Sequence, residues 1–209
     1  MSADGLDAQV RAVDPDRWLS SRFVSDPRAR ADLIALYAFE AELMAIPTRV
    51  TQPLLAEMRY VWWREQLDGV FAGVARKGHP VLEALTDLVD RHGLERGPFD
   101  ALIEAHIGRV HSEPHDLDAF YVGPMQTAVT LLAGPGHEAR ALGAGRMWGL
   151  GQVGRREEAR ALRREANAAL RGLPVGGFPA VAHATLSPTG ATAALKRLAL
   201  LRATILGRL

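Results

Sequence analysis

The chain has 209 residues, of which 48% are hydrophobic and 23% are charged, the composition of an ordinary globular protein. This length allows one domain with a substantial core, and we expect a single domain over residues 1–209. No apolar run reaches the roughly 18 residues of a membrane span, the N-terminus lacks the features of a secretory signal, and cysteine is absent. These properties exclude disulfides and thiolate metal sites, and we expect a cytoplasmic protein.

The net charge of +1 hides an uneven distribution of charged residues along the chain. Residues 1–118 hold 13 basic and 20 acidic residues, whereas residues 119–209 hold 12 basic and 4 acidic residues. A basic second half can bind an anionic partner, such as a membrane surface, a diphosphate or a nucleic acid. Alternatively, the two halves neutralise each other within one fold.

The first predicted helices follow an N-terminal segment, residues 1–13, that we expect to be flexible. A short helix begins at Asp14, and a longer one begins near Arg28 and is apolar around most of its circumference, which is typical of a helix buried in a bundle. Because proline interrupts helices, we expect this helix to end at about Ala45, before Pro47.

A second long helix is predicted to begin at Pro53, since proline is tolerated in a first turn. It carries apolar residues at three- and four-residue intervals as far as Val74. The adjacent Trp62 and Trp63 cannot share one face of a helix, so we expect this helix to have neighbours on two sides.

Three further amphipathic helices are predicted in the middle of the chain. One runs from Val81 to Val89 and is closed by Gly93; the next runs from about Pro98 to Pro114; the third runs from residue 116 to residue 132. No segment alternates between apolar and polar residues in the manner of a strand, and the sequence therefore predicts an all-α fold.

The segment from residue 139 to residue 154 contains five glycines, at positions 143, 145, 149, 151 and 154. A helix there is either loosely specified or tightly packed through its bare backbone. Residues 155–171 are strongly helical. From about Thr192 we expect an amphipathic helix whose basic residues are Lys196, Arg197, Arg202 and Arg208 and whose apolar face comprises Leu195, Leu198, Leu201, Ile205 and Leu206.

Two short motifs suggest other chemistry, and neither has the context it needs. The run from Gly149 to Gly154 matches G-x-G-x-x-G, but a dinucleotide site needs a preceding strand, and a helix is predicted there. His106, His111 and His115 lie close in sequence, but Pro114 separates the last two, so we interpret all three as surface or loop histidines.

Four segments carry a family resemblance: Ser20-Ser21-Arg22-Phe23, Ala35-Leu36-Tyr37-Ala38-Phe39, Arg59-Tyr60-Val61-Trp62-Trp63-Arg64-Glu65-Gln66-Leu67 and His79-Pro80-Val81-Leu82-Glu83-Ala84-Leu85. In this order and spacing they resemble the N-terminal half of the squalene and phytoene synthase family, the head-to-head prenyl synthases. The resemblance covers roughly residues 14–120, and residues 137–209 diverge. It implies a helical bundle of the isoprenoid synthase type, shortened at the C-terminus relative to the active enzymes.

In the active enzymes of that family, the Tyr-Ala-Phe segment leads into an aspartate-rich motif that holds magnesium against a prenyl diphosphate. On this chain the corresponding positions are Met44, Ala45 and Thr48, and the nearest acids upstream are Glu40 and Glu42. Magnesium prefers several hard oxygen ligands. The first magnesium site of the family is therefore missing.

The second aspartate cluster of the family follows a Leu-Gly-x-Ala-like helix start, which is best matched here by Leu142-Gly143-Ala144. Its Arg-Asp step then falls near Arg155-Arg156, and no aspartate occurs after Asp118. Glu157 and Glu158 are the only acids nearby. Both magnesium sites are thus lost together.

The resemblance therefore implies a noncatalytic member of the family, with no catalytic residue, no metal and no cofactor. One group in the family, similar in its Ala-Leu-Tyr-Ala-Phe and Trp-Trp-Arg-Glu segments, assists the assembly of respiratory complex I in mitochondria and has bacterial relatives. By that resemblance we expect an assembly or chaperone-like role at the inner membrane, where the basic C-terminal helix can contact anionic lipid or a protein partner. The candidate pocket or scaffold residues are Tyr37, Phe39, Arg59, Trp62, Trp63 and Arg64.

Two alternatives stay open. One is that the chain is an active prenyl transferase that uses magnesium. The other is that it binds isoprenoid diphosphates with arginines where its relatives use magnesium. Nucleic-acid binding by the basic half would be sensitive to salt. That half lacks interleaved aromatic residues and a recognisable motif, so we expect no nucleic-acid partner.

Overall fold

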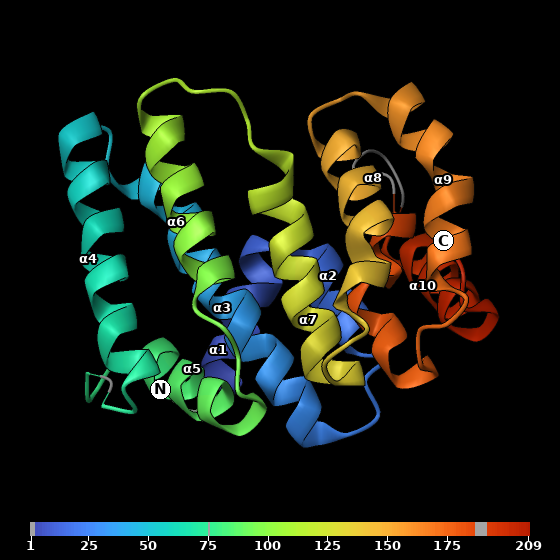
Figure 1. Ribbon diagram of the computed structural model, residues 1–209, viewed down its shortest axis with the longest axis horizontal. Coiled ribbons are helices and arrows are strands. Elements are labelled where there is room, and N and C mark those ends of the chain that lie inside the picture. The colour runs from blue at the N-terminus through green and yellow to red at the C-terminus, as the bar shows by residue number, and fades with distance from the viewer. Residues whose placement is uncertain (1–2, 75, 187–191) are drawn as a thin grey trace. The chain divides into compact units, whose positions relative to one another are not determined.

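The computed structural model describes residues 3–74, 76–186 and 192–209, and these residues form helices joined by turns, with no β-strand among them. The prediction of an all-α fold is confirmed (Figure 1). The chain divides into two compact units, each built from two stretches of sequence: residues 3–15 with 31–116, and residues 16–30 with the described part of 117–209. That they fold together as one domain stays a prediction.

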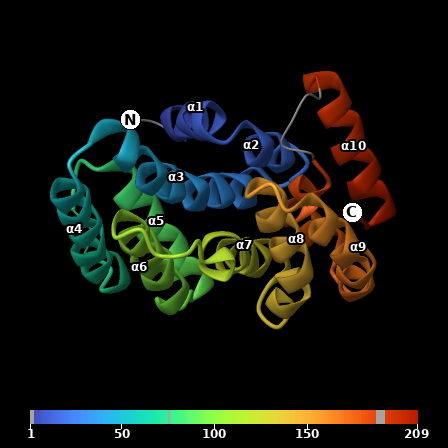
Figure 2. The ribbon, with the colours of Figure 1, turned by 90° about the horizontal axis from the view of Figure 1, so that it is seen from above.

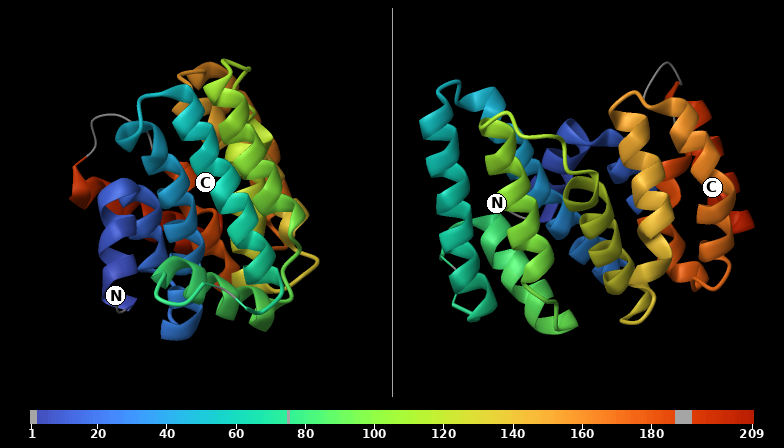
Figure 3. Two further views of the ribbon diagram at one scale, coloured as in Figure 1. Left: turned by 90° about the vertical axis from the view of Figure 1, so that its left-hand side faces the viewer. Right: turned by 45° about the horizontal axis from the view of Figure 1, so that its top comes forward.

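The first unit contains α1 (Ala3–Val13), the greater part of α3 (Pro27–Arg49), α4 (Pro53–Phe71), α5 (Pro80–His92) and α6 (Gly97–Val110). Residues 33–41 of α3 are all buried, which agrees with the predicted central position of this helix. Helix α4 packs against both α5 and α6, and these are the two neighbours that the adjacent tryptophans predict (Figure 3).

The N-terminal segment differs from the expectation of a flexible tail, because residues 3–13 form helix α1. Leu6 and Val10 are buried, one turn apart. Gln9 donates a hydrogen bond to Oε1 of Glu42 on α3 at 2.5 Å, and Figure 2 shows α1 lying alongside α3. Two buried apolar residues and a hydrogen bond to α3 thus anchor this short helix.

Pro47 does not end α3, and the predicted stop at Ala45 is wrong: the helix continues to Arg49. Because proline has no amide hydrogen, the carbonyl of Leu43 loses its donor four residues ahead. The hydroxyl of Tyr60 on α4 donates to that carbonyl at 3.3 Å. A side chain therefore replaces the missing backbone hydrogen bond.

The boundaries of α5 and α6 follow local signals in the sequence. Gly93 closes α5 in the left-handed conformation with φ +58°, as predicted, and His79 caps its N-terminus. Helix α6 ends at Val110, four residues before Pro114, because Ser112 adopts a positive φ of 64° and turns the chain.

The second unit contains α2 (Pro15–Ser21) from residue 16 onward, a π-helical turn η1 (Asp118–Val122), α7 (Gly123–Ala133), α8 (Leu142–Gln152), α9 (Arg156–Leu170), α10 (Ala193–Leu206) and the short 3-10 segments η2 (Glu138–Ala141), η3 (Val175–Ala180) and η4 (Ala182–Thr185). Helices α8 and α9 lie side by side (Figure 3).

The glycines of α8 allow its backbone to approach its neighbours closely. A methyl group added at Gly145 would lie 2.8 Å from Cα of Val122, and one added at Gly143 would lie 3.0 Å from Cα of Ala166 on α9. Of the two interpretations of this segment, tight packing through the bare backbone is therefore the one observed. The G-x-G-x-x-G run lies at the end of this helix, with no strand before it.

Helix α10 has one buried and one exposed side. Leu200 and Ala203 are buried, whereas the five predicted apolar residues, Leu195, Leu198, Leu201, Ile205 and Leu206, are exposed. At 100° per residue these two sets occupy opposite sides of the helix. Lys196 holds the helix to α2 through Asp16, with Nζ 2.6 Å from Oδ1.

Neither α10 nor any other helix in the described ranges is long and apolar enough to cross a membrane.

Candidate functional site

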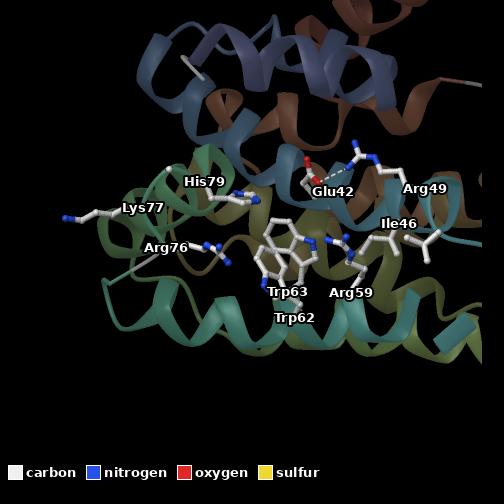
Figure 4. A pocket seen from close by; sticks show the side chains of 11 residues that line it. Glu42, Ile46, Arg49, Arg59, Trp62, Trp63, Arg76, Lys77 and His79 are labelled. Carbon is white, nitrogen blue, oxygen red and sulfur yellow. Dashed lines mark hydrogen bonds and ion pairs between the residues drawn. The ribbon is translucent and has the colours of Figure 1, made fainter. Parts of the chain in front are cut away.

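The first unit has a cavity of about 620 Å³ beside the C-terminal end of α3. Its lining comes from α3, from α4 and from the loop that precedes α5 (Figure 4). Protein pockets that enclose small ligands typically have volumes of about 300 to 1,000 Å³. The cavity is therefore large enough for a small molecule.

The α3 side of the cavity is formed by Glu42, Ile46 and Arg49. Their spacing of four and three residues places them on one side of the helix. Arg49 forms an ion pair with Glu42 at 3.3 Å, and Gln9 donates to the other oxygen of that carboxylate. The continuation of α3 beyond Pro47 brings Arg49 to this site.

An aromatic wall faces α3 across the cavity. The rings of Trp62 and Trp63 meet edge to face, with centroids 5.1 Å apart, and the ring of His79 lies 5.9 Å from Trp62 and 5.3 Å from Trp63. Phe39 supports Trp63 from the core at 5.6 Å. Nδ1 of His79 accepts the amide hydrogen of Leu82 at 3.5 Å, so in the neutral ring Nε2 carries the proton.

Cations surround this aromatic wall. Figure 4 shows Arg59 from α4 and Arg76 from the loop directed toward the tryptophan pair, whereas Lys77 points away from it. Within the described residues, the side chains of these three cations have neither a hydrogen-bond nor an ion-pair partner. The cavity thus combines an apolar wall with guanidinium donors that are available to a ligand.

The structure brings three of the six candidate residues together. Arg59, Trp62 and Trp63 line the cavity. Tyr37 and Phe39 are buried in the core and serve packing. Arg64 is turned to α6, where it pairs with Glu104.

The other lining residues were missed at the level of sequence. On α3, the spacing of Glu42, Ile46 and Arg49 places the three residues on one side of a helix. This pattern was not recognised, because the helix was expected to end at Ala45. The basic pair Arg76-Lys77 beside His79 is a second signal. It marks a cationic loop, but only the fold places this loop opposite α3.

A second group of polar residues lies in the core between α4 and α6. His106 is buried, contrary to the prediction of a surface or loop histidine, and its Nδ1 lies 3.3 Å from the hydroxyl of Tyr60 with the two rings stacked. Burial, together with a smaller effect of nearby His115, lowers the pKa of His106 to about 4. Burial raises the pKa of Tyr60 to about 12. Both groups are therefore neutral at pH 7. The exposed His111 pairs with Glu57 at 3.2 Å.

The first magnesium site of the prenyl synthases does not fit the residues present on α3. Met44 is exposed, Ala45 has no polar side chain, and the hydroxyl of Thr48 donates to the carbonyl of Ala45 at 2.8 Å. The neighbouring Glu42 is engaged by Arg49 and by Gln9. These positions offer no carboxylate to a divalent cation.

The acids near the second position are paired with arginines. Glu158 holds Arg155 through two hydrogen bonds of 2.6 and 2.5 Å, and Glu157 pairs with Arg160. Arginine lowers the pKa of Glu158 through these bonds. Among the described residues, no group of three or more histidine, aspartate or glutamate side chains is arranged to hold a metal ion.

The fold and the site together define a class: an all-α protein of prenyl-synthase type with a cationic and aromatic cavity in its first unit. The comparison with protein families agrees with this class. The family model described as Squalene/phytoene synthase matches residues 10–122, more than half of the chain, and the chain belongs to the squalene/phytoene synthase family. No curated protein matches the chain.

Proposed function

We propose that this protein is a noncatalytic member of the squalene/phytoene synthase family that acts as an assembly or chaperone-like factor at an anionic membrane surface. The observation that carries the proposal is the outer side of α10. It presents five exposed apolar side chains, the most exposed being Ile205 at 72%. An exposed apolar side on a surface helix is typical of a membrane or protein contact.

The charges on α10 favour lipid as the occupant of this side. Arg202 lies among the apolar residues and Arg197 flanks them at 100° per residue, whereas Arg208 follows the helix, after Gly207. Each basic residue close to an anionic bilayer contributes about 1 kcal/mol of attraction, and burial of the apolar side chains adds to it. A helix of 14 residues with this pattern lies in the plane of the interface.

The noncatalytic part of the proposal rests on the residue types at the magnesium positions. Ionisation of an allylic diphosphate develops negative charge on the leaving group, and this charge needs to be neutralised in the transition state. Family enzymes use magnesium for this purpose, held by aspartates. The corresponding residues of this chain, Met44, Ala45 and Thr48, lack the necessary carboxylates. By the family resemblance, the assembly-factor branch is the group in which such a scaffold works without turnover.

Vesicle flotation tests the proposal. The wild-type protein is expected to float with phosphatidylserine-containing vesicles and to stay in solution with neutral phosphatidylcholine vesicles. The double variant Leu198→Ser/Ile205→Ser removes side chains that are 62% and 72% exposed and should lower the bound fraction at least fivefold. A matched control is Leu54→Ser/Met58→Ser on α4, whose side chains are 68% and 60% exposed. Equal binding by both double variants, or no binding by the wild type, would contradict a membrane role for α10.

A further inference from the structure

We propose that the groove between α8, α9 and η4 is a docking site for an extended acidic segment of a partner protein, one in which acidic and apolar side chains alternate. The groove has a volume of about 230 Å³ and lies within the second unit. It has three arginines on one side and apolar residues on the other. The inference goes beyond the membrane contact proposed for the outer side of α10 and does not depend on it.

The basic side of the groove is one face of α9. Arg156, Arg160 and Arg163 line it, and all three are exposed. Their spacing of four and three residues places them within about 60° of one another around the helix axis. Among the described residues that line the groove there is no aspartate or glutamate. This face therefore favours an anionic ligand.

The arginines of this face are accessible to the carboxylates of a ligand. Arg160 pairs with Glu157, but the two side chains are 71% and 85% exposed. Because an ion pair so exposed to water contributes little, a ligand carboxylate can take the place of Glu157. Arg163 donates from Nε to the carbonyl of Leu209 at 3.0 Å, and within the described residues its two terminal nitrogens have no partner.

The opposite side of the groove is apolar. Met147 and Trp148 of α8 and Leu186, which follows η4, form it. The ring of Trp148 meets that of His183 edge to face, with centroids 5.1 Å apart, and this contact orients the indole. The rim at Gly151 is open, because a methyl group added there would meet no atom within 4 Å. Apolar side chains of a ligand can therefore reach this wall.

An extended chain complements both sides of the groove. Successive side chains of such a chain point to opposite sides, so alternating residues present carboxylates to α9 and apolar groups to α8. Carboxylates two residues apart on it are separated by about 6.6 Å, and arginines four residues apart on a helix are separated by about 6 Å along the axis. The spacing of Arg156 and Arg160 thus suits a peptide in which every second residue is acidic.

A second groove extends the positive charge along α9. It has a volume of about 360 Å³, lies between α9, α10 and η4, and shares Arg163 and Thr185 with the first groove. Its other basic residues are Arg202 and Arg208, and its described lining also contains no acid. A longer acidic segment can continue from one groove into the other.

Isothermal titration calorimetry tests this proposal with the acetylated and amidated hexapeptide Glu-Leu-Glu-Leu-Glu-Leu. We expect a Kd on the order of 10 μM and a loss of affinity as the salt concentration is raised. The peptide Glu-Glu-Glu-Leu-Leu-Leu has the same composition and charge. It should bind at least tenfold more weakly, because it cannot present carboxylates to one side and apolar groups to the other.

Two variants test whether the peptide occupies this groove. Arg160→Glu reverses a charge of the basic side, and Gly151→Leu fills the open rim; each should weaken binding about tenfold. The matched control is Arg171→Glu, the same reversal at an exposed arginine outside the groove. Arg59→Glu makes this reversal in the cationic cavity of the first unit. Both controls should bind the peptide as the wild type does.

Circular dichroism melting should show that both groove variants fold. The side chain of Arg160 is exposed, and a carbon added at Gly151 meets no neighbouring atom. The proposal is overturned if the alternating peptide fails to bind, if both peptides bind equally, or if either control weakens binding as much as Arg160→Glu does.

Vesicle flotation of Gly151→Leu distinguishes a peptide from a lipid in this groove. We expect unchanged flotation with phosphatidylserine vesicles together with weakened peptide binding. Lost flotation with unchanged peptide binding would assign the groove to lipid and overturn the proposal. Peptide binding by a wild-type protein that does not float would contradict the membrane role of α10 and support the docking site.

Discussion

The hydroxyl of Tyr60 lies 3.3 Å from the carbonyl oxygen of Leu43, the acceptor that Pro47 leaves without a backbone donor. This hydrogen bond joins α4 to α3 at the point where α3 would otherwise end. It has a direct functional consequence, because the turn of α3 beyond Pro47 supplies Arg49 to the cavity.

Tyr60→Phe is expected to destabilise the protein by about 1 to 3 kcal/mol, because it leaves the buried carbonyl of Leu43 and Nδ1 of His106 with one partner fewer. The cost should be smaller in a Pro47→Ala background, where the amide of residue 47 can bond to Leu43. Urea unfolding of the four proteins in this double-mutant cycle measures the coupling, which we expect to be about 1 kcal/mol. Strict additivity of the two substitutions would contradict the proposed replacement of one donor by the other.

The stability of the protein should fall in mild acid because of His106. Its pKa is about 4 when folded and about 6.5 when unfolded, so the unfolded state takes up a proton first as the pH drops. The contribution of neutral His106 to the free energy of unfolding is complete above pH 6.5 and is lost progressively toward pH 4. We expect the free energy of unfolding to fall by about 2 kcal/mol between pH 7.5 and pH 5. Urea midpoints across this range measure it. In the variant His106→Asn, the loss of stability between pH 7.5 and pH 5 should be smaller by that amount. A loss identical to that of the wild type would show that other groups cause the pH dependence.

Two glycines of α8 should respond to alanine in opposite ways. Gly145→Ala places a methyl group 2.8 Å from Cα of Val122 and should destabilise the protein by about 1 to 3 kcal/mol. Gly151→Ala meets no atom within 4 Å and should stabilise the helix by up to about 1 kcal/mol. Thermal melting of the two variants gives the comparison. If both substitutions stabilised the protein, α8 would be loosely packed.

Asp32 is expected to contribute more to stability than an exposed aspartate with a similar ion pair. It is buried on α3, where its carboxylate contacts Arg91 and lies 2.9 Å from Nε2 of His92 on α5. Asp32→Ala should cost about 2 to 3 kcal/mol, because it leaves these partners of α5 without their acceptor. Asp68 pairs with Arg96 but is 68% exposed, so Asp68→Ala should cost less than about 1 kcal/mol. Chemical denaturation of both variants measures the difference, and equal costs would contradict the role of burial.

Local signals allowed much of the fold to be predicted. Pro80 and Gly93 fix the ends of α5 by their own backbone preferences, and the apolar stripe of α10 is visible in its spacing. The passage of α3 through Pro47 could not be predicted, because it depends on Tyr60, which is 13 residues further along the chain and on another helix. A long-range contact here overrides a local rule.

The candidate site shows the same division between local and long-range information. Trp62, Trp63 and Arg59 belong to a segment that resembles the family, and the sequence singled them out. Arg76 and His79 come from a loop, and only the packing of α5 against α4 brings that loop to the tryptophans. Sequence patterns identify residues within one helix better than residues gathered from several segments.

We propose that this prenyl-synthase scaffold carries out no prenyl transfer. The most direct test is incubation of the purified protein with magnesium and either farnesyl or geranylgeranyl diphosphate, followed by measurement of released inorganic diphosphate and of hydrocarbon products. We predict diphosphate release and product levels equal to those of a reaction without protein. Formation of a C30 or C40 hydrocarbon above that level would contradict this proposal and show that the protein is a catalytic member of its family.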